Sequence, residues 1–185
     1  MSADAIEFGV GEYRLLACLN EPPSGHASYR KHARVLEEFD LTDSMGRYCF
    51  LAVTRSGSDW PSLVVEQRYP PPGTGFRPGV LLAQESHVLF VGAGTRLLAY
   101  QLQDGPRRLW EDCTEYGFWS WAQFDGVVLM SAEIEFAAWS AEGVKLWSTF
   151  VEPPWSYSMS QGQVYLDVMG THSSFPLARG PSRSS

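Results

Sequence analysis

Short apolar runs, spaced about ten residues apart, fill the second half of the chain and constrain its fold more than any other feature. Each run is long enough for one strand, and turn-favouring Gly, Asp and Ser residues separate neighbouring runs. No segment keeps a helical spacing of apolar residues over three turns. Strands at this spacing are typical of an antiparallel sandwich or of a propeller-like array. We therefore expect an all-β chain with antiparallel, stacked sheets, as a partial propeller or a sandwich. The runs are Val80–Gln84, His87–Val91, Arg96–Leu102, Arg108–Trp110, Phe118–Phe124, Val127–Ser131, Glu135–Trp139, Lys145–Phe150, Trp155–Met159 and Val164–Val168.

The first half also predicts strands, at Glu12–Leu19, Tyr48–Arg55 and Leu63–Tyr69. The apolar residues of Arg30–Leu41 fit either a helix or a strand. We favour a strand, because Thr42–Gly46 then forms a turn into the following strand.

The segment Pro70–Gly79 separates the two halves. It holds four prolines and three glycines in ten residues, which excludes a regular element and leaves open whether the loop is a hinge or a lid. A chain of 185 residues fits one domain. We expect a flexible lead-in over residues 1–11, a single β domain over 12–178 with a first-half sheet at 12–69 and a repeat-bearing half at 80–178, and a disordered tail over 179–185.

The second half contains an internal repeat, because Val88–Trp110 aligns with Val127–Trp147. Each copy has a strand, a turn, a strand ending in an aromatic residue, a glycine turn and a Leu-Trp pair. A shorter third copy begins at Gln163 and lacks the Leu-Trp pair. The matched positions are Val88 with Val127, Tyr100 with Trp139, Gly105 with Gly143, and Leu109-Trp110 with Leu146-Trp147.

These two copies resemble the blade repeat of quinoprotein-type (PQQ-like) β-propellers, through Ala99-Tyr100-Gln101…Gly105…Leu109-Trp110 and Ala138-Trp139-Ser140…Gly143…Leu146-Trp147. The resemblance implies stacked four-stranded sheets. It implies no quinone cofactor, since the usual Asp after the first strand pair and the cofactor- and metal-binding residues of the quinoprotein enzymes have no counterparts. Two or three blades do not close a ring, which needs at least about four. We expect the first half, or dimerisation, to cover the exposed sheet.

The charge of the chain excludes two classes of partner. A net charge of −7 argues against a sequence-independent nucleic-acid binder and against docking on an anionic membrane. Nine acidic and three basic residues lie between Asp104 and Glu152, so this stretch holds most of the excess. It suits a basic protein partner.

Cysteine usage and the absence of targeting signals predict a cytoplasmic protein. Cys18, Cys49 and Cys113 are odd in number and widely spaced, which is typical of free thiols in a reducing compartment. The first residues lack the basic and apolar regions of a signal peptide, and no apolar run is long enough to span a membrane.

No motif for catalysis or metal binding is present. The four histidines, His26, His32, His87 and His172, occur singly, and Cys113 has no identifiable base. The Gly92-Ala93-Gly94 turn is not followed by a helix or a lysine, so it is no phosphate loop. We therefore expect no metal, no cofactor and no enzymatic activity.

The segment Trp110–Phe124 is the densest in aromatic and acidic residues. A regular strand over Phe118–Phe124 would place Trp119 and Trp121 side by side on one face. Either both faces are buried in a middle layer, or the tryptophans form a recognition surface beside the neighbouring acids. The Glu152–Tyr157 loop is either exposed or packed between sheets. The candidate binding residues are Trp119, Trp121, Glu111, Asp112, Glu115, Trp155 and Tyr157.

Our leading hypothesis is a non-enzymatic protein-binding module, for example a bacterial immunity-type protein that neutralises a basic toxin such as a nuclease. The alternative is a small-ligand or carbohydrate binder, or a hydrolase, with a tryptophan-lined pocket between repeats. Its acids would be Asp112, Asp167 or the Glu133 and Glu135 pair, which also fits the solvated face of a strand. A third option is a homo-oligomer whose aromatic face is its own interface.

Overall fold

The computed structural model describes residues 5–43, 45–70 and 77–182. These residues form sixteen strands and one helix, arranged in four sheets, none of which closes into a barrel. The expectation of an all-β fold with antiparallel, stacked sheets is confirmed, with one parallel pair in the first half. The chain divides into two compact units, residues 1–74 with 100–108, and residues 75–99 with 109–185.

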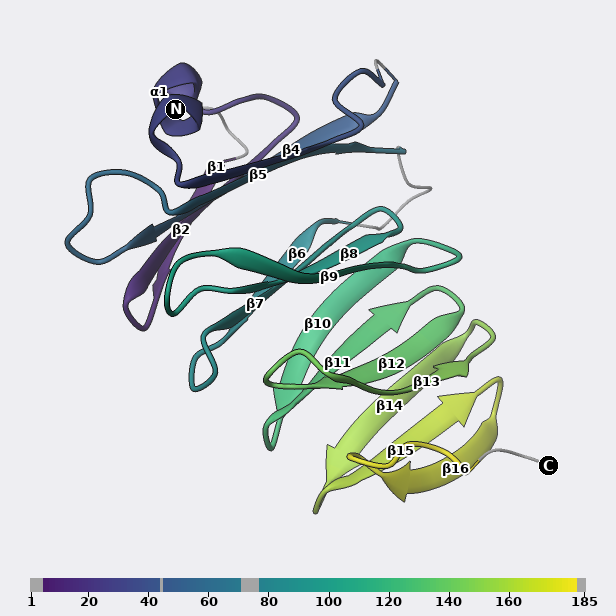
Figure 1. Ribbon diagram of the computed structural model, residues 1–185. Helices are drawn as coiled ribbons and strands as arrows, with labels where there is room; N and C mark the ends of the chain where they lie inside the picture. The colour runs from purple at the N-terminus through teal and green to yellow at the C-terminus, as the bar shows by residue number, and fades with distance from the viewer. Residues whose placement is uncertain (1–4, 44, 71–76, 183–185) are drawn as a thin grey trace. The chain divides into compact units, whose positions relative to one another are not determined.

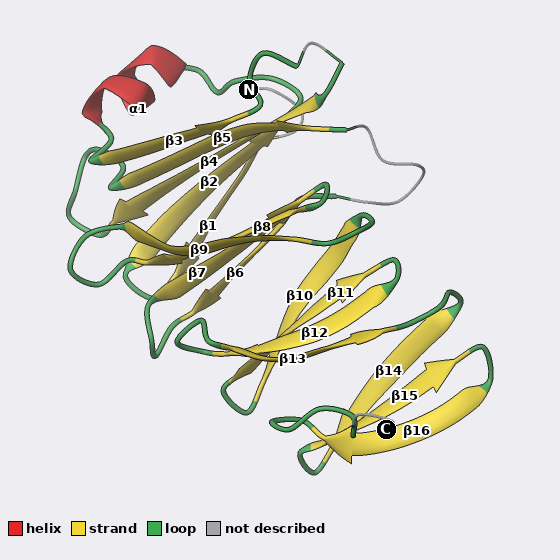
Figure 2. Ribbon diagram, turned by 45° about the vertical axis from the view of Figure 1, so that its right-hand side comes forward, coloured by secondary structure: helices red, strands yellow, loops and turns green. Residues whose placement is uncertain are grey.

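The first unit contains a five-stranded sheet with the order β1-β2-β4-β5-β3. Its central strand is apolar and buried along its whole interior, because both faces of the sheet are covered. Helix α1 lies on one side of the sheet (Figure 2), where Tyr29 and Ala33 pack against Cys18 and Phe50. The elements are β1 (Ala5–Val10), β2 (Tyr13–Leu19), α1 (His26–His32), β3 (Val35–Phe39), β4 (Arg47–Arg55) and β5 (Leu63–Tyr69).

Two expectations for this half are wrong. Of the flexible lead-in expected over residues 1–11, the segment Ala5–Val10 is instead a strand that pairs along its whole length with β2. Residues Arg30–His32 are helical, and only Val35–Phe39 forms the expected strand. The helix has no fully buried residue, so the apolar spacing did not distinguish it from a strand. It follows Gly25, whose positive φ of 77° turns the chain into the first helical turn.

The second unit is a stack of sheets, which Figure 1 shows one behind another. Their orders are β6-β7-β8-β9, β10-β11-β12-β13 and β14-β15-β16. The end of β8, the start of β9 and the turn between them belong to the first unit. The strands are β6 (Gly79–Ala83), β7 (Val88–Ala93), β8 (Arg96–Gln101), β9 (Arg107–Cys113), β10 (Phe118–Phe124), β11 (Val127–Ala132), β12 (Glu135–Ser140), β13 (Lys145–Phe150), β14 (Trp155–Ser160), β15 (Gln163–Val168) and β16 (Thr171–Pro176).

The middle sheet of this stack is buried on both faces. In β11, Val128 and Met130 pack toward the first sheet, while Val127 and Leu129 pack toward the third. A strand between two layers needs apolar residues at every position, which explains the continuous apolar run. The outer face of the third sheet is polar, with Ser156 and Ser158 exposed, so no further layer is needed there.

The sequence repeat corresponds to a repeated connection between sheets. The Trp110 indole Nε1–H donates to the Gly143 carbonyl of the next sheet at 2.6 Å, and Trp147 Nε1–H donates to the Leu177 carbonyl at 2.6 Å. The glycine turns lie against these rings because they lack a Cβ.

The third copy in the sequence has only three strands in the structure. Its last strand, β16, was not expected from the sequence, because its exposed Thr, His and Ser residues do not form an apolar run. The disordered tail expected from residue 179 is also wrong at its start, since Gly180 is buried against Trp147. The central residues 71–76 of the Pro70–Gly79 loop, and residues 183–185, lie outside the described residues.

Candidate functional site

Trp119 and Trp121 do not lie side by side. The pairing of β10 with β11 shifts register between Phe118 and Ser120, so the strand contains a β-bulge at Trp119. The extra residue interrupts the alternation of faces, and Phe118 and Trp121 therefore point into the same layer. Trp121 packs there against Phe90, with ring centroids 5.4 Å apart. The expectation of two tryptophans on one face is wrong for this reason.

The other candidate aromatic residues lie between the second and third sheets. Trp119 stacks on Trp155, with ring centroids 5.3 Å apart and planes at 13°. Trp155 and Tyr157 belong to β14, not to an exposed loop, and both are half-buried. The Trp155 indole N–H also donates to the Glu133 carbonyl oxygen at 3.1 Å. These rings hold layers together, and the interpretation of a middle layer buried on both faces describes them better than a recognition surface.

Three of the predicted acids come together where the first two sheets of the stack, those that contain β9 and β12, meet. Lys145 Nζ lies 2.9 Å from an Asp112 carboxylate oxygen and 3.9 Å from one of Glu135. Burial raises the pKa of the Glu135 carboxyl, Lys145 lowers it, and the charges of Asp112 and Glu115 raise it again. The net shift is upward. We call Asp112, Glu115 and Glu135 the acidic edge.

A well-bonded turn carries Glu115. The Thr114 backbone N–H donates to the Thr95 carbonyl at 2.9 Å, and the Thr114 hydroxyl donates to the carbonyl of Tyr116. Glu115 is exposed, and the Tyr116 side chain is 54% exposed. Tyr116 therefore supplies an exposed aromatic ring in this region, where the interpretation of a recognition surface gives this role to Trp119 and Trp121.

The remaining predicted acids do not join the acidic edge in the same way. Glu111 forms an ion pair with Arg96 at 3.0 Å. Glu133 contributes its backbone carbonyl to Trp155. Asp167 lies beside Tyr157, Tyr165 and His172 in a pocket of about 380 Å³, which has no second carboxylate. A neighbouring pocket of about 240 Å³, which Trp155 lines, also has Asp167 as its one carboxylate.

The described residues also contain no group of three or more His, Cys, Asp and Glu side chains placed to hold a metal ion. Within the same residues, no helix has the length and apolarity needed to cross a membrane.

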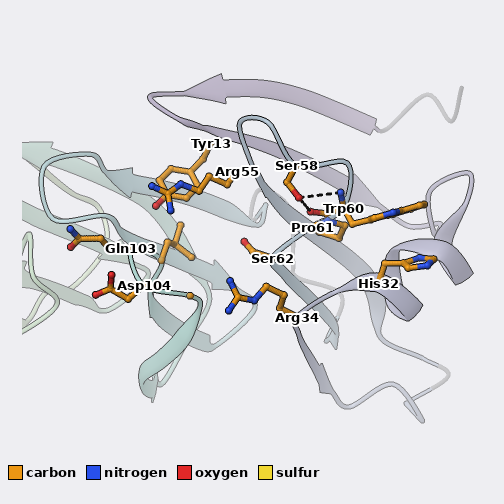
Figure 3. Close-up of a pocket in the computed structure, with 12 residues that line it drawn as sticks. Tyr13, His32, Arg34, Arg55, Ser58, Trp60, Pro61, Ser62, Gln103 and Asp104 are labelled. Atoms are coloured by element: carbon orange, nitrogen blue, oxygen red, sulfur yellow. Dashed lines mark hydrogen bonds between the residues drawn. The ribbon is translucent and has the colours of Figure 1, made fainter.

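The sequence did not predict a pocket of about 450 Å³ in the first unit (Figure 3). Its walls combine charged side chains with apolar ones. No sequence signal marks it, because its residues come from segments far apart along the chain. They are Tyr13, His32, Arg34, Arg55, Ser58, Trp60, Pro61, Ser62, Leu102, Gln103, Asp104 and Gly105.

A buried carboxylate, Glu66, is a second feature that the sequence analysis missed. It is 1% exposed, and it accepts hydrogen bonds from Arg30 Nη1 at 3.1 Å and from the Tyr48 hydroxyl at 3.0 Å. His26 Nε2 lies 3.0 Å from Oε1 of Glu66. Burial, followed by the charge of Glu66, raises the pKa of Tyr48, so the phenol keeps its proton and remains a donor. The available signal was one acid inside the apolar run Leu63–Tyr69.

Comparison with known proteins gives no further guidance. No protein-family model matches the chain, and no curated protein is similar to it. The function is therefore argued from geometry and charge.

Proposed function

We propose that this chain is a non-enzymatic, cytoplasmic protein-binding module that holds a basic partner at its acidic edge. The observation that carries this proposal is a cluster in which Asp112 and Glu135 lie beside Lys145 and Glu115 adds its negative charge to that of Glu135. A bacterial immunity-type protein that neutralises a basic toxin is one form of this function, suggested by charge and size.

The electrostatics of the acidic edge favour a cationic ligand. Two carboxylates, those of Asp112 and Glu135, lie beside Lys145, and the charge of a third, Glu115, also acts on Glu135, so negative charge is in excess in this cluster. The raised pKa of Glu135 reflects partial burial first, and then the repulsion from Asp112 and Glu115. A lysine or arginine from a partner would relieve the repulsion and donate charge-assisted hydrogen bonds to the carboxylates. The exposed Tyr116 ring adds the kind of aromatic contact that is enriched in interfaces.

The state of the three thiols supports the part of the proposal that concerns a reducing compartment. Cys18 and Cys49 are buried, and burial raises the pKa of Cys49 to about 12, which keeps it protonated and unreactive. Cys113 is exposed and free.

Capture from a lysate, quantified by mass spectrometry, tests the proposal. The edge variant carries Asp112→Asn, Glu115→Gln and Glu135→Gln, and the control carries Glu21→Gln, Glu85→Gln and Glu152→Gln, an equal change of charge at exposed positions. We expect the wild type and the control to retain a basic protein that the edge variant binds at least about tenfold more weakly.

Binding measurements with the purified captured protein and the purified variants then decide the outcome. The affinity of the captured protein must fall with rising salt and must depend on the edge acids more than on the control acids. Equal retention by the edge variant and the control, or retention of acidic proteins alone, would overturn the proposal.

A further inference from the structure

The pocket of the first unit contains two charged side chains of opposite sign that have no ion pair. Arg34 and Asp104 both line it, and neither makes a salt bridge or a hydrogen bond to another described residue, or to each other. The second arginine of the pocket, Arg55, is bonded to Glu12 at 2.8 Å. The Arg34 guanidinium therefore remains available on this concave surface. So does the Asp104 carboxylate, which acts on Arg55 and Tyr13 through its charge and not through an ion pair or a hydrogen bond.

The internal repeat shows that the position of Arg34 is unusual. Gly105 is equivalent to Gly143, and an ideal Cβ on Gly105 would lie 3.3 Å from Arg34 Nη2. At Gly143, the corresponding neighbour is the indole of Trp110, whose only N–H is already bonded. At Gly105 a guanidinium takes the place of the indole. It brings a permanent charge and five donors to a turn that elsewhere receives an apolar ring.

The pocket also has an apolar wall. Trp60 is 41% exposed, and its ring stacks on His32 with centroids 4.2 Å apart. Pro61 and Leu102 extend this surface. In the view of Figure 3, the Arg34 side chain lies between Asp104 on one side and the Trp60–His32 pair on the other. A volume of about 450 Å³ is within the usual range for small-molecule sites.

We propose that this pocket binds a free amino acid with an apolar side chain. Its carboxylate pairs with the Arg34 guanidinium, whose planar fork matches two carboxylate oxygens. Its ammonium group pairs with Asp104, and its side chain lies against the wall that contains Trp60. A zwitterion pairs with the Arg34 guanidinium and with the Asp104 carboxylate at once, whereas an ion of one sign would pair with one of them and be repelled by the other. No covalent step is involved, and the site shares no residue with the acidic edge.

Titration of the ¹⁵N-labelled full chain followed by NMR tests the proposal with three matched probes. L-phenylalanine carries both charges, 3-phenylpropionate lacks the amine, and phenethylamine lacks the carboxylate. We expect L-phenylalanine to cause saturable shifts at the amides of Arg34, Asp104 and Gly105, and each analogue to bind at least about tenfold more weakly. Absence of saturable shifts at about 10 mM L-phenylalanine, well above a millimolar dissociation constant, would overturn the proposal. Equal binding of all three probes would also overturn it.

Two variants assign the charges. Arg34→Ala is expected to weaken L-phenylalanine at least about tenfold, while Arg107→Ala, the same loss of charge at an exposed position on the hairpin, keeps the wild-type affinity. Asp104→Asn should weaken L-phenylalanine but strengthen 3-phenylpropionate, because it removes a repelling carboxylate. This crossed effect is not produced by a structural defect. Equal weakening by Arg34→Ala and Arg107→Ala would show a general charge effect and refute the site.

Discussion

Different interactions stabilise the interior of each of the two units. In the first, a five-stranded sheet buries Glu66 and stabilises it with Arg30 and Tyr48. In the second, stacked sheets are joined by aromatic rings and by indole N–H groups that donate to the next layer. A buried charge tolerates little loss of its partners, while an apolar layer tolerates little loss of volume. The units should therefore fail under different substitutions.

The largest effect is expected from Trp139→Ala. Trp139 is 1% exposed and stacks on Trp110 with centroids 5.5 Å apart, so truncation leaves a cavity between two sheets. The expected loss is about 3–5 kcal/mol of unfolding free energy in the second unit. Urea unfolding followed by tryptophan fluorescence measures it, because all tryptophans except Trp60 belong to that unit.

The matched control for this prediction is Phe150→Ala. Phe150 is 68% exposed and should cost less than about 0.5 kcal/mol. Equal costs for the two substitutions would mean that the stack is not stabilised by its aromatic layer.

A charge deletion probes the first unit. Glu66→Ala removes the buried carboxylate that accepts from Tyr48 and is one of the two carboxylates bonded to Arg30, and we expect a loss of about 3 kcal/mol. Glu38→Ala, which removes an exposed partner of Arg30, should cost less than about 1 kcal/mol. Circular dichroism during urea unfolding gives both values. A neutral Glu66→Ala would remove the distinction between the units.

Two glycines separate the effect of backbone conformation from the effect of packing. Gly180 and Gly126 have similar φ values, 73° and 75°, but a Cβ on Gly180 would collide with the Trp147 ring, whereas one on Gly126 meets open space. We expect Gly126→Ala to cost about 1 kcal/mol and Gly180→Ala about 2–3 kcal/mol. Equal melting temperatures of the two variants would contradict a packed inter-sheet turn.

The smallest effect concerns the acidic edge. The pKa of Glu135 is raised in the folded chain, so the folded state binds more protons than the unfolded state between the usual pKa and the raised one. Stability therefore falls as pH rises through that window. Glu135→Gln should abolish this part of the pH dependence and stabilise the chain slightly at neutral pH, as measured by thermal unfolding from pH 4 to 8. A variant that is less stable than the wild type at neutral pH would contradict this prediction, because it would show that the attraction of Lys145 outweighs the burial and repulsion of the Glu135 carboxylate.

The strands of the second unit could be predicted well because each one is a short apolar run between turn residues. The faces could not be predicted, since the single-residue bulge at Trp119 reverses the alternation and leaves no mark in composition. In the first unit, α1 was not distinguished from a strand because its apolar side chains are no more than partly buried, and polar contacts, including those of Arg30, also hold it in place.

For the candidate sites too, the sequence identified individual residues but not the way in which the fold brings them together. Asp112, Glu115 and Glu135 were each identified from the sequence, but their clustering around Glu135 and Lys145 depends on which strands neighbouring sheets bring together. The pocket containing Arg34 and Asp104 could not be predicted, because contacts across about 70 residues carry no local signal.

The indole hydrogen bonds of Trp110 and Trp147 each join the tryptophan to an acceptor that lies later in the sequence, and this order has a consequence for folding during synthesis of the chain. The acceptor of Trp110 lies 33 residues later and that of Trp147 lies 30 residues later. On a ribosome that adds about 5–20 residues per second, each acceptor emerges a few seconds after its donor. The tryptophans of the first and second sheets of the stack, Trp110 and Trp147, thus have no acceptor until the sheet that follows has been synthesised. The nascent chain acquires its inter-sheet bonds in the order of translation, and the final one forms only when Leu177 has been added.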